Sequence, residues 1–278
     1  LTAPKESASA NSYFGMAVDL DPANLRTLAV GCKNCNTSGT NTGSVVLFEP
    51  FNPHASQWTQ TQILSANTLY DLGGTDVQIY DNLVLADYCV STVTPCPSPN
   101  GKVMLFEKVG DHWDPRQTLG YKTPGDFSPG DFSVSSFAVY EDTIVLGVSG
   151  YDVTYGTPAT DVGAVYILQP GIRPGKPAPR QWSIQQVLFA TTPTASDLFG
   201  ADVSIDGNTM IVADGTATAN LYVYERETEK GKWSLQQTIA SVGALTALEL
   251  RGSAFSTVEG TSLTYYHRTG GWDCVLIE

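Results

Sequence analysis

Short apolar runs separated by polar turns repeat along the whole chain, and no stretch shows the 3.6-residue apolar period of an amphipathic helix. The runs are rich in Val, Leu and Tyr with partial alternation, which is typical of strands in packed sheets. Polar turns such as Asp206-Gly207-Asn208 supply the positive φ angles that tight hairpins need. We therefore predict an all-β chain with strands at 16–20, 27–31, 43–49, 58–64, 76–80, 83–87, 101–107, 113–119, 137–141, 143–147, 163–169, 182–188, 202–206, 210–214, 219–225, 233–239, 247–251, 255–259, 261–267 and 272–278.

All five tryptophans of the chain head a similar segment. Trp182 opens WSIQQVL and Trp233 opens WSLQQTI. A residue this rare in one repeated register indicates an internal repeat. We predict that each Trp begins the fourth strand of a unit and covers the flank of its sheet, while the glutamines beside it face solvent. The other three are Trp58, Trp113 and Trp272.

Each predicted unit is a meander of four antiparallel strands, which is the blade of a β-propeller. A β-sandwich is the alternative, but a sandwich has no reason to repeat one Trp for every four strands. Five units fit a closed ring, because propellers have about four to eight blades. The sequence predicts a single propeller domain over 1–278, with blades at 1–63, 64–118, 119–187, 188–238 and 239–278.

Two units open with the pair Phe-Gly, followed in one of them by DVSIDGNTMIVAD, which is a strand, an Asp-Gly turn and a second strand. With the later Trp strand, this order resembles the FG-GAP repeat family. Those repeats build the integrin α-subunit propeller and many secreted or cell-surface proteins, so the resemblance implies a propeller outside the cell. The pairs are Phe14-Gly15 and Phe199-Gly200; Gly73-Gly74, Ser133-Val134 and Ala244-Leu245 replace them elsewhere, and Val30-Gly31-Cys32 and Leu146-Gly147-Val148 come nearest to a literal GAP.

The resemblance also raises a calcium site, because calcium-binding FG-GAP members carry an Asp-rich loop between their first two strands. Only the first unit has a long enough turn, with Asp19, Asp21 and Asn24 as candidate ligands. This turn lacks the glycine and the closing acidic ligand, so six or more oxygen ligands are hard to assemble. We expect an exposed polar turn, with no metal and no cofactor.

The formal net charge is −13. An acidic surface repels phosphate groups, so we expect neither nucleic acid nor an anionic membrane as a partner. No run of 18 apolar residues is present, which predicts no membrane insertion. The opening LTAPKESASAN has neither the basic nor the apolar region of a signal peptide.

Four of the five cysteines fall into two close pairs, and we predict disulfides Cys32–Cys35 and Cys89–Cys96. A redox or zinc CxxC site is a weaker interpretation, because no helix is expected after Cys35 and no histidine lies nearby in sequence. A crossed pairing between the first two units is the competing connectivity. Cys274 remains as a free thiol or a bridge to another chain. The disulfides predict an oxidising compartment, hence a secreted or cell-surface protein.

Strand direction places the loops after strands 2 and 4 at one edge of each blade. These loops are long in the first three units, at 32–42, 88–100 and 148–162, and the lead-in 121–133 lies at the same edge. Long loops without secondary structure tend to be functional. We predict a binding surface there, carrying the glycosylation sequon at Asn36. Its candidate contact residues are Tyr88, Tyr121, Phe127, Tyr151 and Tyr155.

Catalysis is the alternative to binding, because five-bladed propellers include glycosidases with carboxylates around the central channel. Asp87, Asp214 and Glu259 share one repeat position, at the end of the second strand, where we expect them to cap the following loop. No recurring Ser-His-Asp set is visible. The sequence favours a non-catalytic extracellular or cell-surface module for protein or glycan binding, adhesion or assembly with other chains, over a glycosidase-like carbohydrate-active enzyme. The three histidines, His54, His112 and His267, lie in or beside turns.

Overall fold

The computed structural model describes residues 12–35, 43–51, 57–65, 71–89, 102–119, 134–153, 159–171, 181–240, 243–260, 262–268 and 272–275. Over these residues the regular secondary structure consists of strands, and no helix is long and apolar enough to cross a membrane. The strands form five four-stranded antiparallel sheets, which we call blades 1 to 5 in chain order. The blades belong to two compact units, Leu1–Tyr121 with blades 1 and 2, and Lys122–Glu278 with blades 3 to 5.

Each blade is an up-and-down meander whose first strand lies at one side of the sheet and whose fourth strand lies at the other. Blade 1 comprises β1 (Tyr13–Leu20), β2 (Leu28–Lys33), β3 (Ser44–Pro50) and β4 (Trp58–Leu64). Blade 2 comprises β5 (Asp71–Tyr80), β6 (Leu83–Cys89), β7 (Lys102–Val109) and β8 (His112–Leu119). Blade 3 comprises β9 (Ser136–Tyr140), β10 (Thr143–Val148), β11 (Ala164–Gly171) and β12 (Gln181–Leu188). Blade 4 comprises β13 (Asp202–Asp206), β14 (Thr209–Ala213), β15 (Leu221–Glu225) and β16 (Ser234–Ile239). Blade 5 comprises β17 (Ala247–Arg251), β18 (Ala254–Glu259), β19 (Ser262–Arg268) and β20 (Trp272–Val275).

The predicted fold class is confirmed: the chain is all-β and built of five four-stranded propeller blades. The main differences concern the first strands of blades 1 and 2, which begin earlier than predicted. Each continues through an irregularity in its pairing, which lies between Phe14 and Val18 in β1 and between Leu72 and Val77 in β5. Such bulges interrupt the alternation that marks a strand in sequence. The closed ring of five blades stays a prediction.

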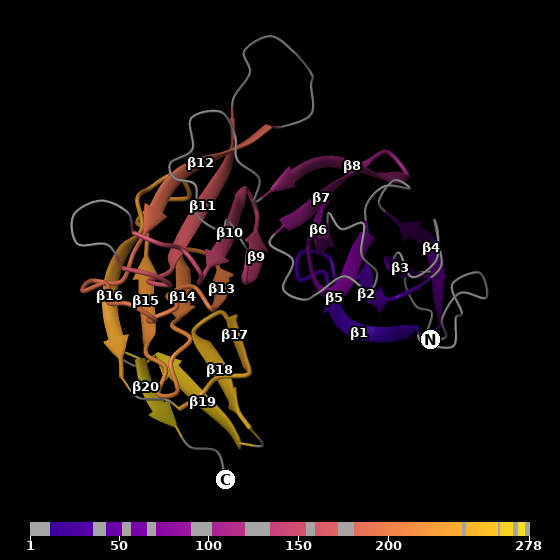
Figure 1. Ribbon diagram of the computed structural model, residues 1–278. Coiled ribbons are helices and arrows are strands. Elements are labelled where there is room, and N and C mark those ends of the chain that lie inside the picture. The colour runs from indigo at the N-terminus through magenta and orange to yellow at the C-terminus, as the bar shows by residue number, and fades with distance from the viewer. Residues whose placement is uncertain are drawn as a thin grey trace. The chain divides into compact units, whose positions relative to one another are not determined.

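Apolar layers between neighbouring blades form the core, and Figure 1 shows blades 3, 4 and 5 as successive twisted sheets of one unit. Phe199 is fully buried between blades 3 and 4, with its ring centroid 5.1 Å from that of Tyr222. Phe255 stacks on Tyr266 in the layer between blades 4 and 5. Blades 1 and 2 enclose an equivalent layer. Strands that are apolar on both faces are therefore explained by a neighbour on each side.

The repeated Trp-Gln motif ties one blade to the next. The side-chain amide of Gln186 donates to the carbonyl of Trp233 and accepts from its backbone N–H, both at 2.9 Å. Gln62 makes the same two bonds to Trp113, at 2.8 and 2.9 Å. The prediction that the glutamines face solvent is wrong for Gln62 and Gln186, which are half-buried and bond to the next blade. It holds for Gln185, which precedes Gln186 and is exposed. The predicted structural role of the tryptophans is confirmed for Trp113, Trp182 and Trp233, which are buried.

The Phe-Gly pair has a steric reason in blade 4. Gly200 has a φ of +88°, and its carbonyl approaches Gly147 of blade 3 so closely that a Cβ on Gly147 would overlap it. Gly74 and Gly31 meet in the same way between blades 2 and 1. Close backbone approach of this kind requires glycine on both sides.

Side chains of the first strands replace backbone pairing between blades. Ser204 accepts the N–H of Leu250 at 2.9 Å, and Asp206 accepts that of Gly252 at 2.7 Å. In blade 1 the equivalent acceptors are Asp19, bonded to Ile79 at 2.7 Å, and Asp21, bonded to Asp81 at 2.9 Å. The register of adjacent blades is thereby set by short polar side chains.

Candidate functional site: a polar pocket between blades 3 and 4

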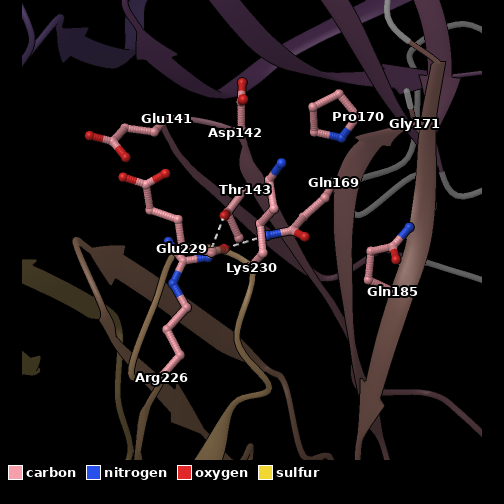
Figure 2. Close-up of a pocket in the computed structure, with 10 residues that line it drawn as sticks. All are labelled: Glu141, Asp142, Thr143, Gln169, Pro170, Gly171, Gln185, Arg226, Glu229 and Lys230. Carbon is pink, nitrogen blue, oxygen red and sulfur yellow. Dashed lines mark hydrogen bonds between the residues drawn. The ribbon is translucent and has the colours of Figure 1, made fainter. Parts of the chain in front are cut away.

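A pocket of about 570 Å³ opens between blades 3 and 4, at the edge that carries the loops after strands 1 and 3 (Figure 2). Blade 3 contributes the β9–β10 turn, the end of β11 and one side chain of β12. Blade 4 contributes the segment that follows β15. The volume lies within the range of about 300–1,000 Å³ that is typical of small-molecule sites. The lining residues are Glu141, Asp142, Thr143, Gln169, Pro170, Gly171, Gln185, Arg226, Glu229 and Lys230.

Arg226 forms the buried wall of this pocket and is only 5% exposed. Its Nε donates to the side-chain oxygen of Asn208, and its Nη1 donates to Thr143 Oγ1 at 2.8 Å and to the carbonyl of Glu229 at 2.6 Å. Its Nη2 donates to the carbonyl of Gly207 at 3.2 Å. These four bonds leave one of the five N–H groups of the guanidinium without a partner among the described residues.

Stacking fixes the guanidinium further, because its central carbon lies 4.7 Å from the centroid of the Trp233 ring. All four hydrogen-bond acceptors are neutral oxygens, and Arg226 has no ion pair within the part of the chain that the structure describes. Burial lowers the pKa of Arg226 from its ordinary value, while the charges of Glu141 and Glu229 act in the opposite direction. An arginine nevertheless stays protonated, so a positive charge is held in place at the pocket wall.

The same repeat position carries an ion pair at two other blade junctions. Lys108 lies opposite its own tryptophan and pairs with Glu49 of the preceding blade at 3.1 Å. Arg268 pairs in the same way with Glu225 at 2.5 Å. Between blades 3 and 4 the acidic position is occupied by Gln169, which is in register with Ser183 as Glu225 is with Ser234. The pocket lies where the ion pair is missing.

Gln169 instead donates its amide to the carbonyl of Glu229 at 2.7 Å, the same oxygen that accepts from Arg226. Figure 2 shows the carboxylates of Glu141 and Glu229 extending toward the same side of the pocket. Gln185 completes the blade 3 wall and bonds to its own strand neighbour Ser183, at 2.9 Å to Oγ. The wall therefore combines acceptors and donors in a preformed frame.

Of the predicted contact aromatics, only Tyr151 has a described side chain, and it is not among the residues that line this pocket. Tyr151 is half-buried, and its ring packs against Tyr166 and Phe189 with centroids 6.5 and 5.5 Å apart. Tyr88 belongs to β6, and the structure describes its backbone alone. The predicted binding residues Tyr121, Phe127 and Tyr155 lie outside the described residues.

The predicted disulfide Cys32–Cys35 is present, with Cα atoms 5.6 Å apart, and both cysteines are buried. This bond leaves no place for the crossed pairing of Cys32 with a cysteine of blade 2. Cys89 ends β6, while Cys96 and the sequon at Asn36 lie outside the described residues. The Cys89–Cys96 disulfide and the free or intermolecular state of Cys274 stay predictions.

The candidate calcium ligands accept hydrogen bonds from backbone N–H groups. Asp19 accepts from Ile79, Asn24 accepts from the N–H of Arg26 at 2.7 Å, and Asp21 Oδ1 accepts from two backbone N–H groups. Oδ2 of the buried Asp21 has no hydrogen-bond partner among the described residues, and calcium needs six or more oxygens. Across the residues that the structure describes, no cluster of three or more His, Cys, Asp or Glu side chains could hold a metal ion.

The carboxylates at the end of the second strands act as caps. Asp214 is buried and accepts from the backbone N–H of Thr216 and of Asn220, which closes the β14–β15 connection. Asp87 accepts from the hydroxyl of Thr75 at 2.6 Å and from its backbone N–H. Burial raises the pKa of Asp87, although these hydrogen bonds oppose the rise. Glu259 lies against Gly243.

Two other carboxylates lie on adjacent first strands, Asp202 on β13 and Glu249 on β17. Burial raises the pKa of Asp202 from 3.8 to about 7, and the negative charge of Glu249 adds to the rise. Burial also raises the pKa of Glu249, which pairs with Arg251 at 2.8 Å. The sequence analysis did not single out this pair, because it joins residues from different units of the repeat.

Comparison with known proteins supports the repeat. A model of the FG-GAP repeat matches residues 182–224, which run from the Trp strand of blade 3 to β15 of blade 4. This chain contains an FG-GAP repeat. The resemblance noted in the sequence is thereby confirmed, and the matched segment includes Phe199-Gly200 and part of the pocket wall. No curated protein matches the chain.

Three solved structures are similar to this chain at low identity. A functionally unknown protein from Desulfotomaculum acetoxidans DSM 771 is 12% identical, with a TM-score of 0.56 over 95% of this chain and 69% of its own. A candidate 6-phosphogluconolactonase from Bacteroides fragilis NCTC 9343 is 9% identical, with a TM-score of 0.49 over 94% of this chain and 83% of its own. Another, from Bacteroides uniformis ATCC 8492, is 11% identical, with a TM-score of 0.49 over 96% of this chain and 86% of its own. The similarity to the protein from Desulfotomaculum acetoxidans supports the fold of this chain and nothing further.

Sequence reasoning missed the pocket. Its walls come from segments far apart in the chain, such as Thr143 and Arg226, which are 83 residues apart. One signal was available: the third strands of blades 1, 2 and 4 carry Glu at the position where blade 3 has Gln169. Aligning the repeats by register reveals that substitution.

Proposed function

We propose that this chain is a non-catalytic β-propeller module that acts outside the cell or at its surface by binding a protein or glycan. FG-GAP repeats are typical of extracellular proteins, and the disulfide Cys32–Cys35 is consistent with an oxidising compartment. The observation that carries the proposal is the pocket between blades 3 and 4. It is preformed, lined by polar groups and held by hydrogen bonds from both blades.

The chemistry of the lining favours binding over turnover. The lining set includes no His, Cys or Ser, and its one hydroxyl, Thr143, accepts a hydrogen bond from Arg226. The lining therefore offers no hydroxyl or thiol nucleophile beside a histidine base, which leaves carboxylate-based glycoside hydrolysis as the alternative. The charged and amide groups of this pocket are instead suited to hold a polar ligand in one orientation.

The second candidate function is that of a glycosidase-like carbohydrate-active enzyme, and the pair Asp202 and Glu249 is the observation that favours it. A glycosidase needs one carboxyl group that stays protonated near neutral pH and one that is ionised. A pKa of about 7 for Asp202, next to Glu249 on the adjacent first strand, meets the first of these requirements.

A screen of the disulfide-intact chain against a glycan array and against cultured cell surfaces tests the proposal. We expect saturable binding to a defined set of glycans or to a surface protein, without release of reducing sugar. Hydrolysis of an aryl glycoside panel that disappears in Asp202→Asn would overturn the non-catalytic function. Absence of any glycan or cell-surface ligand would contradict binding itself.

A further inference from the structure

We infer that the pocket between blades 3 and 4 binds the neutral, hydroxyl-rich end of a saccharide. This inference rests on the proposed function and names the class of ligand for one site. It uses three observations: the mixture of donors and acceptors around the pocket, the rigid frame behind it, and the missing ion pair that leaves it open.

The polar groups of the wall select for a ligand that both donates and accepts hydrogen bonds. Ionised Glu141, Asp142 and Glu229 can only accept, whereas Arg226 and Lys230 can only donate. A hydroxyl group carries one donor and two acceptor lone pairs, so it can bridge the two kinds of group. A ligand carboxylate cannot donate to the three acidic side chains, and a ligand ammonium cannot accept from the two basic ones.

Charge leads to the same class of ligand. Among the described residues of the lining, three acidic and two basic side chains give a net charge of −1, on a chain whose formal net charge is −13. An anionic ligand would be repelled by the negative charge of the lining and by that of the whole chain. A cationic ligand would approach a guanidinium that is buried and has no carboxylate partner among the described residues. A neutral ligand with several hydroxyl groups avoids both costs.

The frame behind the pocket is ordered before any ligand arrives. Arg226 is held by four hydrogen bonds and the Trp233 ring, and the two blades are joined by the bonds between Gln186 and the Trp233 backbone. The remaining N–H of Arg226 is left for a ligand oxygen. Preorganisation of this kind lowers the entropy that binding must overcome.

The other junctions supply an internal comparison. Glu49 with Lys108, and Glu225 with Arg268, place an ion pair at the position where Gln169 and Arg226 lie. Gln169 cannot neutralise Arg226 and turns its amide to the Glu229 carbonyl instead. The pocket is therefore a local departure from the repeat.

Saturation-transfer NMR and calorimetry on the intact chain test the inference. The neutral probes are maltose, cellobiose and lactose; the acidic probe is sodium glucuronate and the basic probe is a trilysine peptide. We expect at least one neutral disaccharide to bind at least tenfold more tightly than glucuronate or trilysine. Tighter binding of either charged probe would overturn the inference.

Two matched variants locate the site. Gln185 and Gln236 occupy the same repeat position and make the same bonds to Ser183 and Ser234, but only Gln185 lines the pocket. We expect Gln185→Ala to weaken disaccharide binding at least fivefold and Gln236→Ala to leave it within twofold of the parent chain. Equal effects of the two would place the site elsewhere and refute the inference, while saccharide binding as such would still support the proposed function.

A third variant closes the pocket without removing a side chain. Gln169→Glu restores the acidic residue of the other junctions, next to Arg226. We expect it to weaken disaccharide binding at least tenfold while the far-ultraviolet circular dichroism of the sheets is retained. Unchanged affinity in a folded Gln169→Glu chain would show that the ligand does not use this pocket.

Discussion

Gln185 and Gln186 are neighbours in sequence with different environments. Gln185 is exposed and bonds to Ser183 of its own strand. Gln186 crosses to blade 4, where it satisfies both backbone groups of the buried Trp233. At the scale of single residues, the repeat thus separates a surface position from a joint between blades by one step along a strand. This step falls at a bulge, because Gln186 pairs with Ile167 and Ile184 pairs with Leu168, which leaves Gln185 between them as the extra residue.

Replacing Gln186 by alanine should destabilise the chain by about 1–3 kcal/mol, since the buried N–H and carbonyl of Trp233 then lose their partners. Urea unfolding followed by tryptophan fluorescence measures the change in the free energy of unfolding. Gln185→Ala is the control, and its effect should stay within about 0.5 kcal/mol. Equal losses for the two variants would show that the contact with Trp233 contributes nothing specific.

Asp202 should make stability fall as pH rises from about 4 to about 7. Burial raises its pKa to about 7 in the folded chain, whereas the ordinary value is 3.8. Between these values the folded chain keeps a proton that the unfolded chain has lost, so the free energy of unfolding decreases with pH. The loss should be at most roughly 4 kcal/mol, because the two pKa values differ by about three and each pKa unit corresponds to about 1.4 kcal/mol.

Asp202→Asn should remove that part of the pH dependence, because asparagine does not titrate while its side-chain oxygen can still accept from the N–H of Val203. Unfolding curves of both chains at pH 4, 6 and 8 make the comparison. We expect the variant to gain stability relative to the parent chain as pH rises. Parallel curves at all three values would contradict a raised pKa for Asp202.

At the scale of strands, blades approach one another through glycine. Gly147 on β10 faces the carbonyl of Gly200, which precedes β13. The Phe-Gly pair of the repeat thus has two functions: Phe199 fills the layer between blades, and Gly200 permits the close approach. Blade 2 keeps only the second, with Gly73-Gly74 in place of Phe-Gly, and Leu72 is buried beside them.

Gly147→Ala should destabilise blade packing by about 1–3 kcal/mol or more, because the new methyl group would overlap the Gly200 carbonyl and crowd Ser136. Gly150→Ala, three residues along the chain, is the control, since the nearest atom to its added carbon lies 3.7 Å away. That control should be neutral or stabilising by up to about 1 kcal/mol. Thermal unfolding of the two variants distinguishes them, and equal melting temperatures would refute the steric argument.

At the scale of the whole molecule, each blade presents two edges with different chemistry. The edge with the loops after strands 1 and 3 carries the pocket between blades 3 and 4. The opposite edge is the one where strand 2 of each blade ends, and the sequence predicts the long loops and their contact aromatics there. In blade 3 that long loop is tied to the lead-in of blade 4, because Leu198 donates to the carbonyl of Asp161 at 2.9 Å and Phe199 to that of Val162 at 3.1 Å.

The two edges give separable predictions for partner binding. If partners use the long loops, the double variant Tyr88→Ala and Tyr155→Ala should weaken cell-surface binding at least tenfold, while Gln185→Ala should not. Tyr151 is left unchanged in this test, because its packing on Tyr166 and Phe189 means that its removal would also lower stability. Flow cytometry with labelled chain provides the measurement, and the reverse pattern would assign the partner to the pocket edge.

The sequence by itself determined the strands, the turns between them and the repeat of four. These features depend on neighbouring residues: Asp206-Gly207-Asn208 suits a tight turn, and alternating Val, Leu and Tyr suit a buried sheet. The Trp segments marked the fourth strands because each segment is recognised from its own neighbouring residues. Because local propensity and pattern agreed along the chain, the fold class followed from the sequence.

Only the tertiary structure decided which polar side chains meet. Thr143 of blade 3 accepts a hydrogen bond from Arg226 of blade 4, and the charge of Glu249 of blade 5 acts on Asp202 of blade 4; no local pattern encodes either interaction. The ionisation of Asp202 likewise follows from its burial between blades rather than from its neighbours in sequence. The substitution of Gln169 for glutamate was visible in the sequence, but its consequence was not. A missing ion pair becomes a pocket only once packing has brought two blades together and excluded water from the charge that remains.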